Sequence, residues 1–428
     1  MKTTHATYMV FLPFIVIAFL SCKKDELKPS DKLYIFSEGT IGFFLNPPTL
    51  VDNCIYIGTS RGDNKITSDH NAFFKFDSTL KEIWSYPLGK KEVRGAASLD
   101  SFGNVYFVVG EGIKLSPDGY FIKLYSLDKN GFFRWSKDLI GNPFVFHGMS
   151  NPAVSADNQI YIGGNGIFYA FDINGKEIWK YTGCAQTILS APVIDDEGNI
   201  YFTAMNEVIS LDRLGAERWH FNSNEDIESY PDGSGLSSPA FSTDYSRLIV
   251  PQWKTIYCLG TDNGEIVWKY RVPWMVGDFR ATPAVDDHDN IYIGNHGIGD
   301  KTQSLFAIKS DGTGMLWYTK IGADLYSSPA LGDDKVIYVG SEFSGDEGYT
   351  FHAIDMLTGE IIWSTVQRSD VTFSSPVISN SGIVYVGTMG NENGPGELIA
   401  FHSSSHGLLP NAGSPRFHGS NSSSGRKE

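Results

Sequence analysis

The stretch Ala353-Ile354-Asp355-Met356-Leu357-Thr358-Gly359-Glu360-Ile361-Ile362-Trp363 is the fullest copy of a pattern that recurs along this chain of 428 residues. Each copy runs from a short β-rich run through a turn to a tryptophan. The mean spacing between copies is about 46 residues, a period typical of proteins built from structural repeats. We therefore expect one architecture to occupy most of the chain. The tryptophans that close the copies are Trp84, Trp135, Trp179, Trp219, Trp268, Trp317 and Trp363.

Each period contains four short runs rich in β-branched and aromatic residues. It opens with a proline motif such as Thr282-Pro283, continues through a turn such as Asp286 to Asn290, and reaches a run such as Ile291 to Gly294. A further run, a glycine turn and the tryptophan-bearing run complete it. Short runs bounded by turn residues predict β-strands, and the repeat lacks helical periodicity. The sequence therefore predicts an all-β fold of four-stranded antiparallel units, the arrangement of β-propeller blades.

The repeat is out of phase with the ends of the chain. An eighth set of strands ends at Leu398 to Phe401 and lacks a tryptophan strand, while Leu33 to Phe36 stands at the matching distance before Pro48. We therefore predict an eight-bladed β-propeller whose last blade is closed by the N-terminal strand, because closure leaves no exposed sheet edge. A ring of seven blades closed by Leu408-Leu409 is the alternative.

The tryptophan repeat resembles the tryptophan-docking motif of the PQQ-like β-propellers. This family includes quinoprotein alcohol dehydrogenases and the propeller lipoprotein of outer-membrane barrel assembly. The resemblance covers nearly all of the chain after the signal region and implies that each repeat tryptophan packs between adjacent blades. The dehydrogenases carry a vicinal cysteine pair beside the quinone and insertions that build the active site. Here Cys54, Cys184 and Cys258 are widely spaced, so we expect no cofactor and no catalysis.

The N-terminus is typical of a bacterial lipoprotein. Lys2 precedes an apolar stretch from Tyr8 to Leu20, and Phe19 to Cys22 resembles a lipobox. We expect residues 1–21 to be a signal peptide, Cys22 to carry the lipid, and residues 22–32 to be a linker. The run Lys23 to Glu26 resembles an export signal of surface lipoproteins, which favours the outer cell surface over the periplasmic face of the outer membrane. Both orientations stay open.

Composition restricts the partners. The formal net charge is -15, and basic residues form no run longer than a pair, which argues against nucleic acid and against an anionic lipid surface as the principal partner. We expect a monomer with one propeller domain at residues 33–410. Residues 411–428 are predicted to be an irregular tail, and trimming it after Arg416 is expected to cost less stability than deleting Leu33 to Phe36.

No metal site or catalytic constellation is predicted. His402 and His406 would share a face only on a helix, and this serine-rich segment follows a strand. The acidic stretch Asp286 to Asn290 lacks the twelve-residue ligand series of a calcium loop. Aspartate, asparagine and glycine recur wherever a blade turns, and tight hairpins require them.

The longest loops are predicted on one rim of the ring, formed by the second-to-third loops and the connections between blades. Long loops on a rigid scaffold commonly carry binding function. Trp253 and Trp274 are outside the repeat register and are predicted to be neighbours there, with Asp278 and Arg280 entering the central funnel. Aromatic faces with convergent polar groups suit a sugar or a peptide side chain. The alternative is that both tryptophans cap the core. Weaker candidates at equivalent points are Arg94, His147, Tyr326 and Phe373.

The sequence thus favours a non-catalytic, lipid-anchored binding or scaffold module of the bacterial cell envelope. Its partner would be an envelope protein. Two alternatives stay open: a surface glycan- or peptide-binding lipoprotein, and an atypical PQQ-dependent dehydrogenase.

Overall fold

The computed structural model describes residues 28, 30–37, 46–60, 70–112, 120–139, 150–185, 188–223, 237–275, 277–297, 303–344, 348–367, 371, 374–389 and 396–426. These residues form β-strands joined by turns and loops, and no α-helix occurs among them. In this part of the chain there is accordingly no helix long and apolar enough to cross a bilayer.

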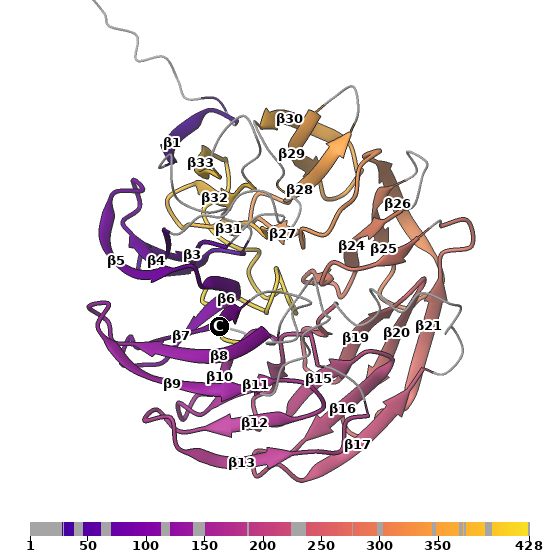
Figure 1. The fold of residues 1–428 in the computed structure, drawn as a ribbon. Helices are drawn as coiled ribbons and strands as arrows, with labels where there is room; N and C mark the ends of the chain where they lie inside the picture. The colour runs from indigo at the N-terminus through magenta and orange to yellow at the C-terminus, as the bar shows by residue number, and fades with distance from the viewer. Residues whose placement is uncertain are drawn as a thin grey trace, which may run out of the picture.

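Eight sheets are arranged in a ring, and each sheet is one blade (Figure 1). Blade one contains β2 (Thr49–Val51), β3 (Cys54–Gly58), β4 (Asn71–Phe76) and β5 (Glu82–Gly89), and blade two contains β6 (Glu92–Leu99), β7 (Val105–Gly112), β8 (Tyr120–Leu127) and β9 (Phe133–Leu139). Blade three contains β10 (Ala153–Val154), β11 (Ile160–Gly163), β12 (Phe168–Phe171) and β13 (Glu177–Tyr181), and blade four contains β14 (Val193–Ile194), β15 (Ile200–Ala204), β16 (Glu207–Leu211) and β17 (Glu217–Asn222). Blade five contains β18 (Ala240–Phe241), β19 (Arg247–Gln252), β20 (Thr255–Gly260) and β21 (Ile266–Arg271), and blade six contains β22 (Asp278–Phe279), β23 (Ala284–Val285), β24 (Ile291–His296), β25 (Ser304–Ile308) and β26 (Met315–Lys320). Blade seven contains β27 (Ala330–Leu331), β28 (Val336–Ser344), β29 (Gly348–Asp355) and β30 (Ile361–Gln367), and blade eight contains β31 (Val377–Ile378), β32 (Ile383–Gly387), β33 (Leu398–His402) and β1 (Lys32–Phe36).

The eighth blade confirms the predicted closure. Strand β1 pairs antiparallel with β33, with Ile35 opposite Ile399 and Phe36 opposite Leu398. The Phe36 ring also lies 4.6 Å from the ring of Phe76 in the first blade, measured between centroids. The N-terminal strand therefore completes one blade and packs on the next. The seven-bladed alternative is wrong, because Leu408 makes only an isolated bridge, to Gly332.

The repeat tryptophans join each of the first seven blades to its successor, as the resemblance implied. The indole of Trp219 donates a hydrogen bond of 2.8 Å to the carbonyl oxygen of Thr261 in the next blade. Its ring lies on Gly264, where a Cβ atom would come within 2.6 Å of it and where φ is +71°. Only glycine satisfies both conditions without strain. The same pairing of indole and glycine recurs at Trp84 with Gly131, Trp135 with Gly175, Trp179 with Gly215, Trp268 with Gly312, and Trp317 with Gly359.

The Ser/Thr-Pro motif at the start of blades five to eight connects the inner strands along this part of the ring. The Ser238 hydroxyl accepts a hydrogen bond from the amide of Ala191 in the preceding blade. Thr282, Ser328 and Ser375 accept equivalent bonds from Ser238, Thr282 and Ser328. A hydroxyl before the proline thus satisfies a buried amide next to the channel, which would otherwise cost free energy.

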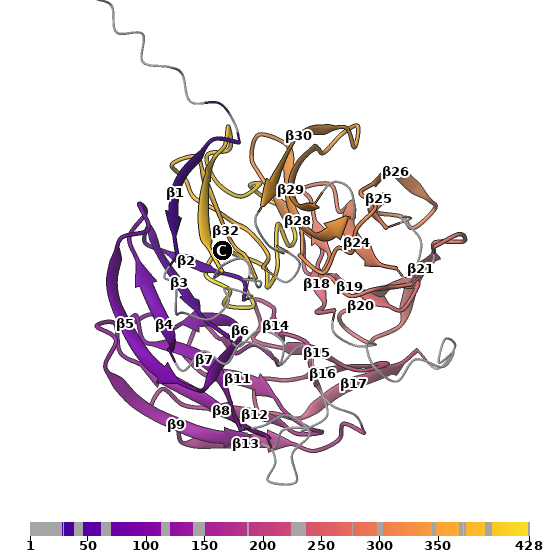
Figure 2. The ribbon, with the colours of Figure 1, turned by 45° about the horizontal axis from the view of Figure 1, so that its top comes forward.

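The C-terminal segment, residues 403–426, fills the central channel. Figure 1 and Figure 2 show it, in yellow, inside the ring. It contains no strand, yet it hydrogen-bonds to the inner strand of every blade. Its partners are Leu50, Ser98, Val154, Ile194, Phe241, Val285, Leu331 and Ile378.

Most of these partners are at the ends of the inner strands, so the segment lies toward the face formed by the first-to-second turns. We call this face the short-turn face and the opposite one the loop-rich face. Arg416 and His418 are 0% and 1% exposed. Trimming after Arg416 would remove the buried His418 and the Ser420 and Ser423 partners of Arg416. Its cost relative to that of deleting Leu33 to Phe36 stays a prediction.

Candidate functional site

A cluster of polar side chains lies on the loop-rich face between the sixth and seventh blades. Asp278 belongs to β22 and is the register partner of His296, the last residue of β24. Asp324 stands five residues before Pro329, as Asp278 stands five residues before Pro283. Successive blades therefore deliver two aspartates to the same level. The cluster consists of Asp278, Arg280, His296, Asp324, Tyr326 and Glu342, and we call it the rim cluster.

His296 connects the two aspartates. Its Nδ1 atom lies 3.0 Å from Asp278 Oδ1, and its Nε2 atom lies 3.5 Å from Asp324 Oδ2. The imidazole is 15% exposed, and the carboxylates are 5% and 15% exposed. Charge-assisted contacts between side chains that are this little exposed to solvent are stronger than the same contacts in water. The imidazole is thereby held in one orientation between two blades.

Arg280, the arginine of the cluster, contacts an aspartate and an aromatic ring. Arg280 Nε donates to both oxygens of Asp278, at 3.1 and 3.0 Å. The guanidinium carbon lies 5.6 Å from the centroid of the Tyr326 ring, which is a cation–π distance. Burial raises the pKa of the Tyr326 phenol, so this side chain remains a neutral donor.

The acidic end of the cluster brings Glu342 next to Asp324. Burial, followed by the nearby Asp324 carboxylate, raises the pKa of Glu342 to about 7. The Glu342 amide also donates to the Asp324 carbonyl oxygen at 2.9 Å. Two close carboxyl groups cannot both ionise without repulsion. The rim cluster can therefore gain or lose one negative charge near neutral pH.

The two off-register tryptophans lie beside the sixth blade. Trp253 is in the turn between β19 and β20, and its carbonyl oxygen accepts a 2.8 Å hydrogen bond from the amide of Phe279 on β22. Trp274 is 43% exposed. Its ring centroid lies 4.8 Å from that of Tyr318 and 5.7 Å from that of Phe306. Both tryptophans thus contact the sixth blade, one through its backbone and one through its ring.

The other predicted site residues are distributed differently. Arg94 lies on β6 in the second blade, where it forms an ion pair with Glu92. Cys22, His147 and Phe373 lie outside the described residues.

Sequence reasoning missed three members of the rim cluster: His296, Asp324 and Glu342. The sequence does contain a pattern that points to Asp324, because Asp324 precedes its proline by the same number of residues as Asp278 does. A second pattern points to His296 and Glu342, since both stand four residues after the tyrosine of the second strand, Tyr292 or Tyr338.

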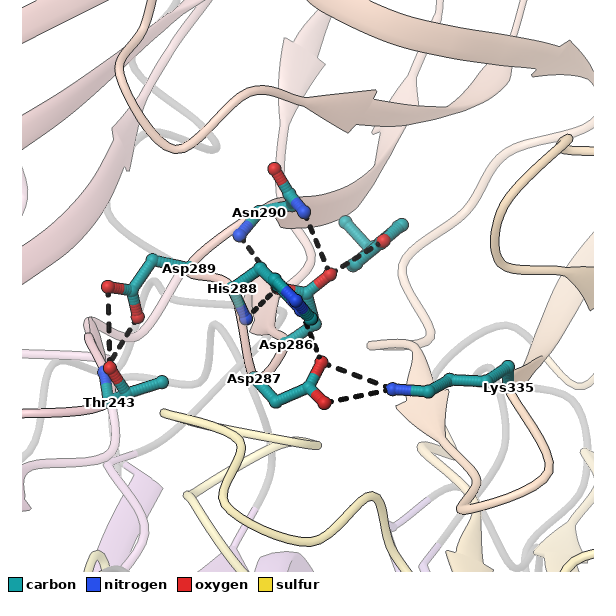
Figure 3. A network of polar contacts seen from close by, with 8 residues as sticks. Thr243, Asp286, Asp287, His288, Asp289, Asn290 and Lys335 are labelled. Carbon is teal, nitrogen blue, oxygen red and sulfur yellow. Dashed lines mark hydrogen bonds and ion pairs between the residues drawn. The ribbon is translucent and has the colours of Figure 1, made fainter.

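The acidic stretch on the short-turn face forms a turn, as its composition predicted (Figure 3). Potential ligand atoms of Asp286, Asp287 and His288 lie within 4.8 Å of one another. However, Asp286 already accepts hydrogen bonds from the amides of His288 and Asn290 and from the Asn290 side chain. Asp287 pairs with Lys335 at 3.0 Å.

The bonding of Asp286 is repeated in two other blades. The turn aspartate there accepts bonds from the amides two and four residues later and from the asparagine side chain. These turns begin at Asp100 and Asp195. The carboxylates of this stretch thus have roles in the blade, and the group carries no metal assignment.

The family is decided by a sequence model described as outer membrane protein assembly factor BamB, which matches residues 56–270 and 254–416. The chain belongs to this family. No curated protein matches it. Among solved structures, BamB from Moraxella catarrhalis is similar at 15% identity and a TM-score of 0.62, covering 87% of this chain and 99% of that one.

Two further solved structures are of other kinds. The quinohemoprotein alcohol dehydrogenase from Comamonas testosteroni is similar at 14% identity and a TM-score of 0.66, covering 90% of this chain and 78% of that one. The C-terminal WD40 domain of Sif2 is similar at 10% identity and a TM-score of 0.60, covering 88% of this chain and 99% of that one. Likeness to such different proteins shows a shared propeller fold alone.

The residues present do not fit the quinone of the dehydrogenases. The vicinal cysteine pair typical of those enzymes has no counterpart, because Cys54, Cys184 and Cys258 are free thiols in separate parts of the ring. Cys258 is fully buried in the apolar cluster between blades five and six. Burial raises the pKa values of both Cys184 and Cys258 to about 12, which leaves inert thiols.

Proposed function

We propose that this protein is a non-catalytic, lipid-anchored propeller that binds or scaffolds other proteins at the bacterial cell envelope. The observation that carries the proposal is the family match over residues 56–270 and 254–416. The family is named for outer membrane protein assembly, and we carry this setting over to the chain as part of the proposal. The lipid on Cys22 would hold the propeller at the outer membrane, with the surface-facing orientation favoured by Lys23 to Glu26.

The rim cluster and Trp274 are proposed to contact the partner. Trp274 and Tyr318 present an exposed aromatic pair, 43% and 53% exposed. Aromatic residues and arginine dominate the binding energy of protein interfaces. Large aromatic side chains left in solvent on a loop-bearing face are more typical of an interaction site than of a core.

The charges of the rim cluster favour a basic segment of the partner. Asp278, Asp324 and Glu342 outnumber Arg280, whose guanidinium is already paired. A lysine or arginine of the partner would meet Asp324 and Glu342 and favour the ionised form of Glu342. We therefore propose a peptide segment that carries one apolar or aromatic side chain for Trp274 and one basic side chain for the carboxyl pair.

Site-specific photo-crosslinking in living cells tests this proposal. A photoreactive residue replacing Trp274 should give a discrete adduct with an envelope protein. The same residue replacing Leu214, which is 74% exposed on a third-to-fourth turn of blade four, serves as the matched control. Asp324→Asn should weaken the adduct at position 274. Equal adducts at positions 214 and 274, or no effect of Asp324→Asn, would contradict the proposed surface.

Catalysis is tested separately. Titrating the purified protein with pyrroloquinoline quinone should leave the absorbance spectrum of the free quinone unchanged. A shifted spectrum together with alcohol-dependent reduction would establish the dehydrogenase alternative.

A further inference from the structure

A pocket of ≈ 550 Å³ opens on the short-turn face, away from the rim cluster. Its walls come from the turns of blades eight, one, two and three, and its remaining side comes from the C-terminal segment. Pockets of roughly 300–1,000 Å³ are typical of small-molecule sites. Polar side chains lining it include Asp52, Asn53, Asn158, Asn380, Asn421 and Arg426.

Part of this lining is fixed by bonds within the protein. The Asn158 side chain accepts a 2.9 Å hydrogen bond from the Ser101 amide. The Asn421 amide group donates to the Ile378 carbonyl oxygen at 2.7 Å. Asp100 is saturated by its own turn and by the hydroxyl of Tyr106. The pocket therefore has a preorganised frame, which lowers the entropic cost of binding a ligand.

Other lining groups still have hydrogen-bonding capacity. Arg426 Nε donates to the Val154 carbonyl oxygen at 2.9 Å, and its two terminal amino groups have no bond among the described residues. The side chains of Asp52, Asn53 and Asn380 likewise form none there, and all three residues are exposed. A guanidinium, a carboxylate and two amides thus line one pocket with donors and acceptors in similar number.

This mixture selects a chemical class of ligand. An anion would meet Arg426 favourably but would be repelled by Asp52 and Asp100. A cation would be attracted by Asp52 and Asp100 but repelled by Arg426. A neutral ligand with many hydroxyl groups can donate to the carboxylate and accept from the guanidinium at the same time. The apolar side chains of Leu50 and Leu99 also line the pocket, and they suit the C–H face of a sugar ring.

We propose that this pocket binds a neutral mono- or disaccharide. The C-terminal segment is part of the site, because Asn421 and Arg426 complete its wall. The pocket is distinct from the rim cluster and does not depend on the protein-binding function proposed for it.

Saturation-transfer NMR with the full chain tests the site. The probes are maltose, cellobiose, lactose and N,N′-diacetylchitobiose, with triglycine and inorganic phosphate as competitors. At least one disaccharide should receive saturation and should not be displaced by either competitor. Asp52→Asn and Asn380→Ala should each weaken its binding by about tenfold, as expected for loss of a hydrogen bond to the ligand.

The control is Asp196→Asn. Asp196 is an exposed aspartate in the corresponding turn face of blade four, outside the pocket, and its replacement should leave binding unchanged. Because Asp52→Asn preserves a residue type that tolerates the φ of +49° at this position, loss of binding cannot be ascribed to backbone strain. No saturation for any disaccharide, displacement by phosphate or triglycine, or equal binding by Asp52→Asn and Asp196→Asn would overturn the proposal.

Discussion

Among the described residues outside the strands, Arg416 is the side chain whose removal we expect to damage the fold most. It is 0% exposed. Its guanidinium donates to the carbonyl oxygens of Pro376 at 3.0 Å and Pro48 at 3.4 Å. These prolines open the eighth and the first blade, so Arg416 spans the seam at which the ring closes. It also donates to Ser420 and Ser423 of its own segment, at 2.6 and 3.1 Å.

The expected loss in the free energy of unfolding follows from these four hydrogen bonds. A hydrogen bond to a charged group contributes roughly 1.5–3 kcal/mol, and each buried acceptor left without a donor costs roughly 1–3 kcal/mol. We expect Arg416→Ala to lower the free energy of unfolding by roughly 3–5 kcal/mol, because it leaves several buried carbonyl groups of the seam without a donor. Arg416→Lys should have an intermediate effect, since it retains the charge but loses the planar fork.

Urea titration followed by tryptophan fluorescence and circular dichroism measures this effect. Arg213→Ala is the control, because Arg213 is an exposed arginine on a third-to-fourth turn and its loss should cost no more than about 0.5 kcal/mol. Equal transition midpoints for Arg416→Ala and Arg213→Ala would refute the view that the C-terminal segment fastens the seam.

Four further predictions follow from buried or anchoring groups. Burial lowers the pKa of His418 to about 4 from an ordinary 6.5. The neutral imidazole therefore contributes about 3 kcal/mol to the free energy of unfolding above pH 6.5, and this contribution is lost as the pH falls toward 4. His418→Asn should accordingly reduce the acid-induced fall in melting temperature. The raised pKa of Glu342 acts in the opposite sense, destabilising the fold as pH rises through about 7, so Glu342→Gln should raise the melting temperature at pH 8 relative to that of the wild type and leave it unchanged at pH 5. Trp219→Ala should lower the free energy of unfolding by roughly 3–5 kcal/mol, measured by urea titration. Cys22→Ala should release the protein from membranes, and persistence of the variant in the high-salt membrane fraction would contradict the anchor.

The strands and the closure could be predicted from sequence because their determinants are local and repeated. A β-rich run, a turn and a tryptophan recur in seven blades, six of these turns contain glycine, and the fold requires these residues at those places. Trp219 and Gly264 illustrate the reason: the indole covers the glycine and bonds to the same turn. The missing eighth tryptophan strand was equally visible, since a repeat out of phase with the chain ends must be completed from the other end.

The C-terminal segment could not be predicted in this way. Residues 419–425 are all glycine, serine or asparagine, a composition that usually indicates a flexible linker. Small residues are what a narrow channel admits, and most of the bonds from the segment to the inner strands use its backbone carbonyl groups. At Gly425 an added Cβ atom would lie 2.6 Å from the Pro192 carbonyl oxygen. Such a fit depends on the assembled ring and leaves no periodic pattern in the sequence.

The rim cluster is an intermediate case. Asp278, Arg280 and Tyr326 were expected at the funnel from their register, and the structure brings them together. His296, Asp324 and Glu342 complete the group only because adjacent blades repeat the same offsets. A site formed between two repeats is visible in sequence when both repeats are compared position by position.

The C-terminal segment also separates the two proposed sites. It hydrogen-bonds to the inner strands of all eight blades toward the short-turn face, so a ligand in the pocket contacts this segment while a partner at the rim cluster contacts the opposite face. Substitutions that are far apart and share no partners usually have additive effects. Asp52→Asn and Asp324→Asn should therefore act independently, the first on sugar binding and the second on crosslinking at position 274. Coupling between the two would require the C-terminal segment itself to move, and Arg416, fixed to both sides of the seam, opposes that movement.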